Sequence, residues 1–316
     1  MSKLLNYAII NVFAESPWGG NPLAIVPNAD TLDSATMQLI ARQFNLSETV
    51  FICSPDQGSK HAARLRIFTP DHEMPFAGHP TIGASSWLHQ HLNLPDTFTL
   101  QTNAKTVTIH HNDGVYRLML SGYTSSDCAF SNEHLAHALH LHTDDFAAPA
   151  RWMNAGTWQL IVPLNSAAAV NRAQPNLVAL LDPNVDAAHL NVYLWHESDN
   201  EVTSRYFFNI EQTVLEDPGT GSACCNLGAW AHSAGLAPLS WHITQAASIN
   251  RPNHLYLNVN ETGEIQVGGR VMPFATGQLT LPEKAKKQRQ LNAKRHLFGH
   301  AVLDSLQKIS QDMPNI

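Results

Sequence analysis

Charged side chains are scarce in this chain of 316 residues, and the acidic ones outnumber the basic ones. Asp, Glu, Lys and Arg make up 14% of the sequence, against about 25% in an average soluble protein, and the formal net charge is -7. A nucleic-acid-binding protein would carry a basic excess, and a disordered chain would combine more charge with fewer apolar residues. The composition therefore indicates a folded protein that does not bind nucleic acid.

Cysteine and long hydrophobic runs are also rare. The four cysteines, Cys53, Cys128, Cys224 and Cys225, are too few for a disulfide scaffold in a chain of this length. Cys224 and Cys225 are adjacent, which excludes a Cys-x-x-Cys redox or zinc pair between them. No apolar run approaches the length of about 18 residues that predicts a membrane span, and the N-terminal segment lacks the apolar core of a signal peptide. We expect a soluble, cytoplasmic protein of two domains that does not contact membranes.

Short apolar runs bounded by turn residues alternate with fewer helical segments, which predicts a mixed α+β protein. Helices are expected where apolar side chains recur every three or four residues, over these stretches: 34–45, from about 79 to 88, 133–140 and from 222 onward. Strand structure is expected over these stretches: 7–13, 23–26, 49–53, 63–68, 97–109, 115–120, 158–162, 192–195 and 206–208.

The two halves of the chain are similar to each other. An offset of 139 residues aligns three pairs of identical residues: Arg66 with Arg205, Phe68 with Phe207, and Thr81 with Thr220. An offset of 136 residues aligns the segment 20–27 with the segment 156–163 at a Gly, an Ile, a Val and a Pro. These matches predict a duplicated unit, a mostly β domain with one long helix that occurs twice.

Two segments that lead into helices place a titratable side chain directly before a proline, His79 in one and Asp217 in the other. The first N–H groups of a helix lack intrahelical partners and lie at the positive end of the helix dipole. Small residues around both starts let an anion approach these groups, and a carboxylate suits the site as well as a phosphate. Each segment alone is equally typical of an ordinary helix start, but their repetition predicts that His79 and Asp217 face one cleft.

A third candidate is Glu48, at the junction between a predicted helix and the apolar strand 49–53. A glutamate that is partly desolvated beside Val50 and Phe51 suits a proton shuttle near neutral pH. An exposed turn glutamate is the alternative, and these residues leave both open.

The chain resembles the PhzF-like phenazine-biosynthesis family, within the diaminopimelate epimerase superfamily, at motifs that follow the family's order along nearly the whole chain. The motifs are these: Gly20-Asn21-Pro22, Leu46-Ser47-Glu48-Thr49, Phe68-Thr69-Pro70, Gly78-His79-Pro80-Thr81, Glu216-Asp217-Pro218, Thr220-Gly221-Ser222-Ala223 and Arg251-Pro252. The histidine-proline and aspartate-proline motifs, in this order and spacing, are the most specific part of the resemblance.

The resemblance implies an α+β fold of two similar domains, each a mostly antiparallel β-barrel-like sheet around a central helix, with the active site in the cleft between them. The first domain would span residues 1–125, with a return at about 275–290, and the second would span residues 126–274. Residues 291–316 extend past the family core, and their apolar spacing predicts a C-terminal amphipathic helix. The resemblance also implies a homodimer.

The activity that the resemblance implies is that of a cofactor-independent isomerase. It would use general acid–base catalysis on a small carboxylate-bearing substrate, possibly cyclic and similar to dihydro-hydroxyanthranilate. Glu48 would move the proton, with His79 and Asp217 as its catalytic partners. The substrate would be bound by these residues: Gly78, Thr220, Gly221, Ser222 and Ala223. Neither a metal nor a cofactor is expected.

Two alternatives stay open. Epimerases of the superfamily use one thiol per domain, but Cys224 and Cys225 lie seven and eight residues past Asp217, so an amino-acid epimerase or racemase here would need a non-thiol base pair. A catalytically silent carboxylate-binding protein would keep the same site. The histidines from His134 to His142 lack a His-Glu-x-x-His pattern, so an amphipathic helix is expected there rather than a metal site.

Overall fold

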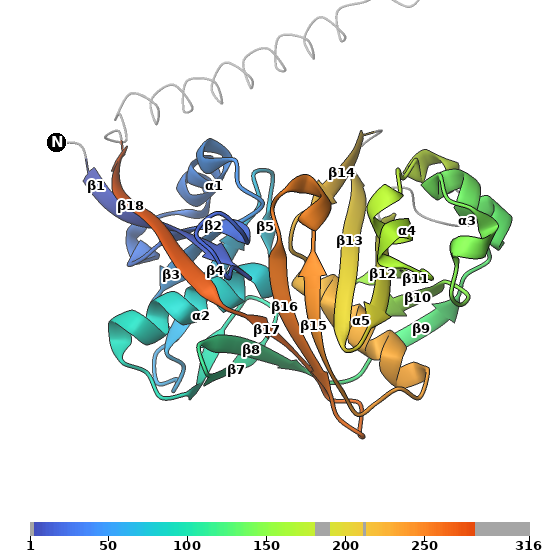
Figure 1. The fold of residues 1–316 in the computed structure, drawn as a ribbon. Helices are drawn as coiled ribbons and strands as arrows, with labels where there is room; N and C mark the ends of the chain where they lie inside the picture. The colour runs from blue at the N-terminus through green and yellow to red at the C-terminus, as the bar shows by residue number, and fades with distance from the viewer. Residues whose placement is uncertain (1–2, 181–189, 211–212, 282–316) are drawn as a thin grey trace, which may run out of the picture. The chain divides into compact units, whose positions relative to one another are not determined.

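The structure, a computed structural model, describes residues 3–180, 190–210 and 213–281 (Figure 1). Contacts divide the chain into two units, residues 7–276 and a smaller unit made of residues 1–6 and 277–316. Within the described part of the smaller unit, Nε2 of Gln278 donates a hydrogen bond to Oδ1 of Asn6 at 3.0 Å. The predicted C-terminal helix, residues 291–316, lies outside the described residues.

Both halves of the chain are built mostly from strands. The first half contains β1 (Lys3–Val12), β2 (Asn21–Val26), α1 (Ser34–Phe44), β3 (Thr49–Cys53), β4 (Ala63–Phe68), β5 (Glu73–Met74), α2 (Gly78–Leu92), β6 (Thr97–Gln101), β7 (Thr106–Asn112) and β8 (Val115–Leu120). The second half contains β9 (Thr124–Asp127), α3 (Asn132–Leu139), β10 (Arg151–Asn154), β11 (Trp158–Pro163), α4 (Ala167–Arg172), β12 (Asn191–Ser198), β13 (Glu201–Ile210), β14 (Thr213–Asp217), α5 (Gly221–Ser233), β15 (Leu239–Gln245), β16 (Asn253–Val259), β17 (Ile265–Gly269) and β18 (Val271–Leu281).

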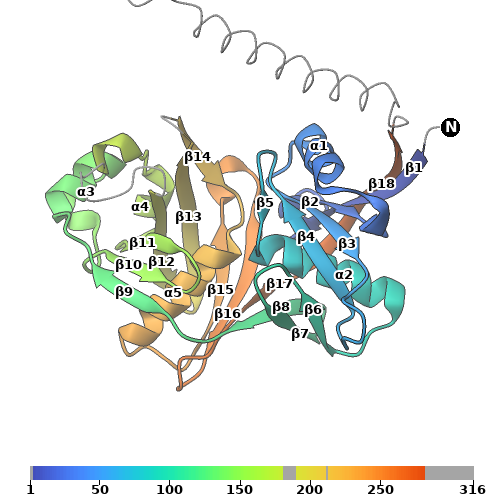
Figure 2. The ribbon, with the colours of Figure 1, turned by 180° about the vertical axis from the view of Figure 1, so that it is seen from behind.

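The strand pairing of the first half is repeated in the second, which confirms the duplication (Figure 2). Strand β4 pairs with β3, with the short β5 and, in parallel, with β6, while β13 pairs in the same way with β12, β14 and β15. Strands β2 and β3 are parallel, as are β11 and β12. The antiparallel pairing of β8 with β17 joins the two halves into one sheet.

One ion pair recurs at equivalent places in both halves. Arg66 on β4 binds both carboxylate oxygens of Glu73 on β5, at 2.8 and 2.6 Å. Arg205 on β13 binds Glu216 on β14 in the same bidentate way, at 3.0 and 2.8 Å. Such a pair fixes both position and orientation. In each half it therefore holds the short strand that leads into the long helix, α2 or α5.

The long helices are wrapped by their own strands. Helix α2 contacts β2, β3, β4 and β8, and α5 contacts β10, β11, β16 and β17. These strands lie at separate places along each ladder, so the sheet of each half curls around its helix, as the resemblance predicts. A Cβ added at Gly83 would lie 2.9 Å from Val12 and even closer to Leu23, and one added at Gly228 would lie 2.9 Å from Ile265. Glycine at these two positions allows the strands to approach the helices.

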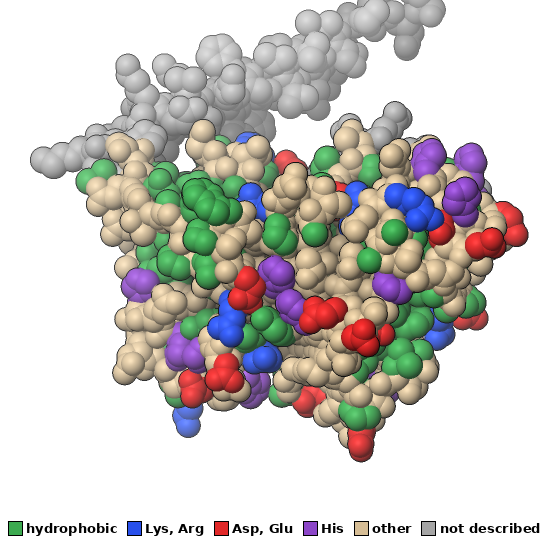
Figure 3. Space-filling model, in the orientation of Figure 1, with side chains coloured by type: hydrophobic (Ala, Val, Ile, Leu, Met, Phe, Trp, Pro, Cys, Tyr) green, Lys and Arg blue, Asp and Glu red, His purple; other side chains and the backbone are tan. Residues whose placement is uncertain are grey.

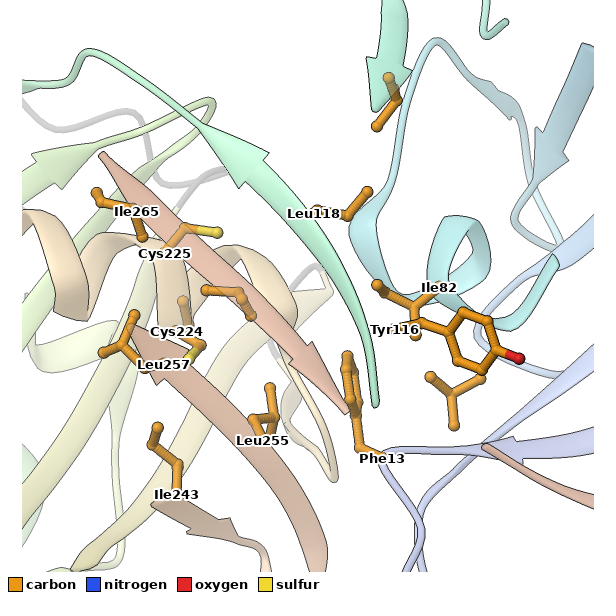
Figure 4. Close-up of a cluster of buried hydrophobic side chains, with 14 of the residues drawn as sticks. Phe13, Ile82, Tyr116, Leu118, Cys224, Cys225, Ile243, Leu255, Leu257 and Ile265 are labelled. Atoms are coloured by element: carbon orange, nitrogen blue, oxygen red, sulfur yellow. The ribbon is translucent and has the colours of Figure 1, made fainter. Parts of the chain in front are cut away.

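Helix α5 is apolar on almost all sides, which is typical of a helix enclosed by a core. Cys224 and Cys225 lie within that core, beside Leu257 and Ile265 (Figure 4). Ile82 of α2 and Phe13, at the end of β1, belong to the same hydrophobic cluster. The two halves therefore share one continuous core.

A second hydrophobic cluster covers the outer face of the second half. It joins α3 and α4 to strands β11 and β12, through Leu135, Val170, Leu160 and Leu194 among others. Histidines gather on the surface over α3 (Figure 3). Two of these histidines are hydrogen-bonded to backbone carbonyls. Nε2 of His134 donates to the carbonyl of Ala179, and Nδ1 of His140 donates to the carbonyl of Gln174, both at 2.6 Å.

The elements expected from local patterns are present, with one refinement. The stretch expected to be strand over 97–109 forms two strands, β6 and β7, because a turn interrupts it. The Thr102 hydroxyl donates to the carbonyl of Lys105 at 2.8 Å and accepts from the N–H of Lys105 at 3.1 Å. In the part of the chain that the structure describes, every helix is too short or too polar to cross a membrane.

Candidate active site

The second residue of α2, His79, contacts Glu48, which directly precedes β3. Nδ1 of His79 lies 2.8 Å from Oε2 of Glu48. The histidine side chain is 6% exposed and the glutamate side chain 17%. Strands β2 and β3 run in parallel and both contact α2, so residues 31 positions apart meet where β3 and α2 begin. Glu48 is therefore a partly buried member of a pair and not an exposed turn residue.

The proton of this pair can be placed from the other side of the ring. Nε2 of His79 lies 3.1 Å from the backbone carbonyl oxygen of Asn21. A carbonyl oxygen only accepts, so Nε2 carries a hydrogen. The bond between Nδ1 and Glu48 then holds one further proton, which makes the pair either imidazolium and carboxylate or neutral imidazole and carboxylic acid. Either arrangement stores one transferable proton at the site.

Electrostatics favour a protonated imidazole. Burial disfavours the charged form of His79, but the hydrogen bond to Glu48, and the charges of Glu48 and Asp217, outweigh burial and raise the pKa of His79. The charge of Asp217 acts on His79 although the two residues come from different halves of the chain. Both residues are also hydrogen-bonded to Asn21, so the structure brings the two duplicated motifs to one site.

Asp217, the last residue of β14, is held in its own network. Its Oδ1 accepts a hydrogen bond from Nδ2 of Asn21 at 3.1 Å, and its Oδ2 accepts one from the hydroxyl of Thr220. Burial raises the pKa of Asp217, as does the charge of Glu48, while the Thr220 hydroxyl and His79 act in the opposite direction. Asp217 is thus a carboxyl group that binds its proton more tightly than usual.

Asn21, the first residue of β2, links the two catalytic candidates. Its backbone carbonyl accepts from His79, and its side chain donates both to Asp217 and, at 3.1 Å, to the carbonyl of Gly219. The Asn21 residue is 1% exposed, so these bonds are shielded from water. In the sequence, Asn21 is marked only by the Gly20-Asn21-Pro22 motif, and the family resemblance implies no role for that residue.

Two buried glutamines, which no motif indicates, support the second helix start. Nε2 of Gln245 on β15 donates to the carbonyl of Asp217 at 2.8 Å, and its Oε1 accepts from the N–H of Thr220 at 3.2 Å. Nε2 of Gln159 on β11 donates to the hydroxyl of Ser222 at 3.1 Å. Ser222 is exposed, and because its oxygen accepts from Gln159, its own proton is directed elsewhere, toward any bound acceptor. Gln159 is marked in the sequence only as a polar residue within an apolar strand, and Gln245, the last residue of the mixed strand β15, carries no such signal.

The starts of α2 and α5 lack side-chain caps. In the described part of the chain, α1, α3 and α4 are each capped by the residue before the helix, whose side chain accepts a hydrogen bond from a backbone N–H. The capping residues are Asp33, Ser131 and Ser166. Helices α2 and α5 begin after Ala77 and Thr220 with no such bond. A Cβ added at Gly221 would lie 3.9 Å from the backbone nitrogen of His79, so the two starts are adjacent. Together they offer a concentrated set of N–H donors to an anion.

The other predicted binding residues differ in which of their groups are available to a ligand. Gly78 and Gly221 lie at the two helix starts, where only the backbone is available. Ala223 is 0% exposed, so the structure buries this predicted binding residue in the core. The Thr220 hydroxyl is engaged by Asp217.

The thiols are remote from this chemistry. Burial raises the pKa of Cys225 to about 12, and that of Cys224 well above its ordinary value. Both thiols therefore stay protonated in the apolar core and are not bases. These two buried thiols give no support to a two-thiol mechanism, which stays disfavoured as the sequence predicts.

Comparison with known proteins places this site in context. Residues 10–277 match the PhzC-PhzF family model, described as phenazine biosynthesis-like protein. An uncharacterized isomerase of Pasteurella multocida is 46% identical over 277 residues, which are 87% of this chain and 94% of that protein. The trans-2,3-dihydro-3-hydroxyanthranilate isomerase of Pseudomonas aeruginosa is 32% identical over 87% of this chain and 99% of that protein. The crystal structure of a phenazine biosynthesis protein of the PhzF family from Bacillus anthracis has the same fold, with a TM-score of 0.78 and 24% identity over 88% of this chain and 100% of that one.

Proposed function

The chain belongs to the phenazine biosynthesis-like (PhzC-PhzF) family and is an isomerase, and we propose that it moves a proton within a small carboxylate-bearing substrate by general acid–base catalysis. The observation that carries the proposal is the hydrogen bond between Glu48 and His79, beside Asp217 and two uncapped helix starts. A base, a proton donor and an anion site are the three components that such a reaction requires.

The substrate carboxylate binds at the helix starts in this proposal. The N–H groups that follow Ala77 and Thr220 donate to it, and the Ser222 hydroxyl adds a further bond. This placement brings a neighbouring C–H bond of the substrate to Glu48.

Glu48 then removes a proton from that carbon, and the electron pair of the broken C–H bond shifts into the conjugated system of the substrate. The hydrogen-bonded His79 stabilises the glutamate as it gains and loses the proton. Glu48 returns the proton to a different carbon of the same molecule. The number of atoms and electrons is unchanged, so the product is an isomer and the enzyme regains its starting protonation state. Asp217, whose pKa is raised, orients the substrate, and a proton that it lends to a developing oxyanion returns to it when Glu48 reprotonates the carbon.

The name of one relative supports a proposal for the substrate class. The Pseudomonas aeruginosa relative is named for trans-2,3-dihydro-3-hydroxyanthranilate, a cyclic carboxylate. We propose a substrate of the same chemical type, a cyclic or α-amino carboxylate, without a bound cofactor.

A second candidate is an epimerase, favoured by one observation: the carboxyl groups of Glu48 and Asp217 come from different halves of the chain, as the two bases of such an enzyme would. A carboxylate-binding protein without activity is the third candidate.

The homodimer that the family resemblance implies is also proposed, and an exposed aromatic pair supports it. The rings of Trp18 and Phe274 lie 6.3 Å apart, and the exposed fractions of the two residues are 79% and 54%. Light scattering of the purified protein tests the dimer.

Exchange in heavy water distinguishes the three functions. Candidate substrates are incubated with enzyme, and the α-carbon and ring protons are followed by NMR. Isomerisation with deuterium incorporation, lost in Glu48→Gln and retained in the control Glu261→Gln on an exposed turn, is expected. Inversion at the α-carbon would favour the epimerase. Tight carboxylate binding without turnover of any substrate would favour the silent protein, and full activity of Glu48→Gln would exclude Glu48 as the base.

A further inference from the structure

Three metal-ligating side chains meet away from the candidate active site. They are His89 near the end of α2, Asp96 in the loop before β6, and His111 on β7, and each offers one ligand atom within 4.8 Å of the other two. Nδ1 of His111 lies 3.1 Å from Oδ1 of Asp96, and Nε2 of His89 lies 4.0 Å from the same oxygen. The second distance is too long for a hydrogen bond. Two ligands that each lie about 2.0–2.2 Å from one tetrahedral ion are about 3.4 Å apart, so a small rotation of the exposed Asp96 side chain would bring Oδ1 and Nε2 to that spacing.

We propose that His89, Asp96 and His111 form a binding site for a divalent transition metal of the zinc type. Two imidazoles and one carboxylate suit Zn²⁺ and its neighbours in the first row, whereas Mg²⁺ and Ca²⁺ prefer oxygen ligands alone. Three protein ligands leave one position of a tetrahedral ion open, for water or for a group from another molecule.

The two rings are already oriented for this role. Nδ1 of His89 lies 3.0 Å from the hydroxyl of Tyr116, which leaves Nε2 to face Asp96. Metal-binding histidines commonly use their second ring nitrogen in this way, and the bond sets both tautomer and orientation. The ring of His89 also lies parallel to Phe98, within 8°, and that of His111 stacks on Tyr116 with centroids 4.5 Å apart.

The carboxylate is anchored through its backbone. The N–H of His111 donates to the carbonyl of Asp96 at 2.8 Å, so the two ligands keep their register when the Asp96 side chain rotates. That side chain is 79% exposed, while the side chains of His89 and His111 are 19% and 20% exposed. An ion can therefore enter from solvent and find two preset nitrogen ligands.

The position of the site separates it from proton transfer. His89 follows His79 by ten residues on α2, which corresponds to about 15 Å of helix. A metal here would connect the end of α2 to β7, the strand next to β8. We expect it to stabilise the first half of the chain without taking part in the reaction.

The experiment uses the full chain without a histidine tag, because a tag would bind the same ions. Co²⁺ and Zn²⁺ are titrated by calorimetry and, for Co²⁺, by visible absorption. One equivalent is expected to bind wild-type protein and to raise its melting temperature. His89→Ala and His111→Ala are each expected to lose the binding, the absorption bands and the rise in melting temperature.

Two further variants make the test specific. His110→Ala removes the adjacent histidine of β7, whose Nδ1 lies 3.2 Å from the Thr97 hydroxyl on the other face of the strand, and is expected to bind metal like wild type. Tyr116→Phe keeps all three ligands and is expected to weaken metal affinity about tenfold. Circular dichroism in EDTA verifies that each variant is folded. Unchanged binding in both His89→Ala and His111→Ala, or no binding to wild type at micromolar Zn²⁺, would overturn the proposal.

Discussion

Nδ1 of His79 and Oε2 of Glu48 are 2.8 Å apart and share one proton, because Nε2 of the same ring already donates to the carbonyl of Asn21. The sharing links the protonation of the histidine to the folded state. We therefore expect His79 to affect the free energy of unfolding as well as the activity.

The stability of the protein is expected to depend on pH through His79. Its pKa is raised above the unfolded value of 6.5, so the contribution is fully present below pH 6.5 and is lost as pH rises through the folded pKa. Asp217 acts in the same direction from its own unfolded value of 3.8. Urea unfolding between pH 6 and 9 should therefore show a falling free energy of unfolding. His79→Gln should flatten that slope and His110→Gln should not, whereas an identical slope in His79→Gln would contradict the assignment.

Substitution of Asn21 by alanine is expected to affect stability and chemistry together. The change removes the donor shared by Asp217 and the carbonyl of Gly219, and a buried acceptor left unpaired costs about 1–3 kcal/mol. Activity should fall as well, because Asp217 loses one of its two side-chain partners. Denaturant unfolding and the heavy-water assay measure the two effects. A variant with wild-type stability would show that water replaces the amide at no cost.

Two glycines of α2 should separate stability from ligand binding. A Cβ at Gly83 would clash with Leu23 and Val12, so Gly83→Ala is expected to lower the free energy of unfolding by about 1–3 kcal/mol. At Gly78 the nearest atom is Leu118 at 3.6 Å, and alanine favours a helix, so Gly78→Ala should keep or slightly raise stability. Its methyl group should nevertheless weaken carboxylate binding at the helix start, as calorimetry with a substrate analogue would detect. Equal binding by Gly78→Ala and wild type would argue against an anion at this position.

The duplicated ion pairs are expected to differ in importance. The side chain of Arg205 is 11% exposed, and its guanidinium also donates to the carbonyls of Val170, Asn171 and Ala173, so Arg205→Ala should cost about 3–5 kcal/mol. Arg66 is 18% exposed and has fewer partners, Glu73 and the hydroxyl of Ser34, so Arg66→Ala should cost less. Thermal and urea unfolding of both variants give the comparison. A larger loss for Arg66→Ala would show that burial does not set the difference.

Local patterns in the sequence were sufficient for much of the fold. A continuous apolar run placed β3 and apolar alternation placed β4 correctly. Asp33 caps α1 where a helix start was expected. These patterns involve neighbours only a few residues apart. The internal repeat predicted the duplicated ladder, since equivalent positions such as Arg66 and Arg205 have the same task in each copy. The domain boundaries and the dimer stay predictions.

The sequence by itself also determined which groups could do the chemistry: a histidine and an aspartate at two helix starts, and a glutamate before an apolar strand. Only the tertiary structure decided their partners. Asn21 bonds to Asp217 across 196 positions, and Gln159 reaches Ser222 across 63. The packing of α2 against the β6–β8 sheet brings His89 to Asp96 and His111. Side-chain hydrogen bonds and metal ligation depend on distances of a few ångströms, and for residues so far apart those distances are set when the elements pack together.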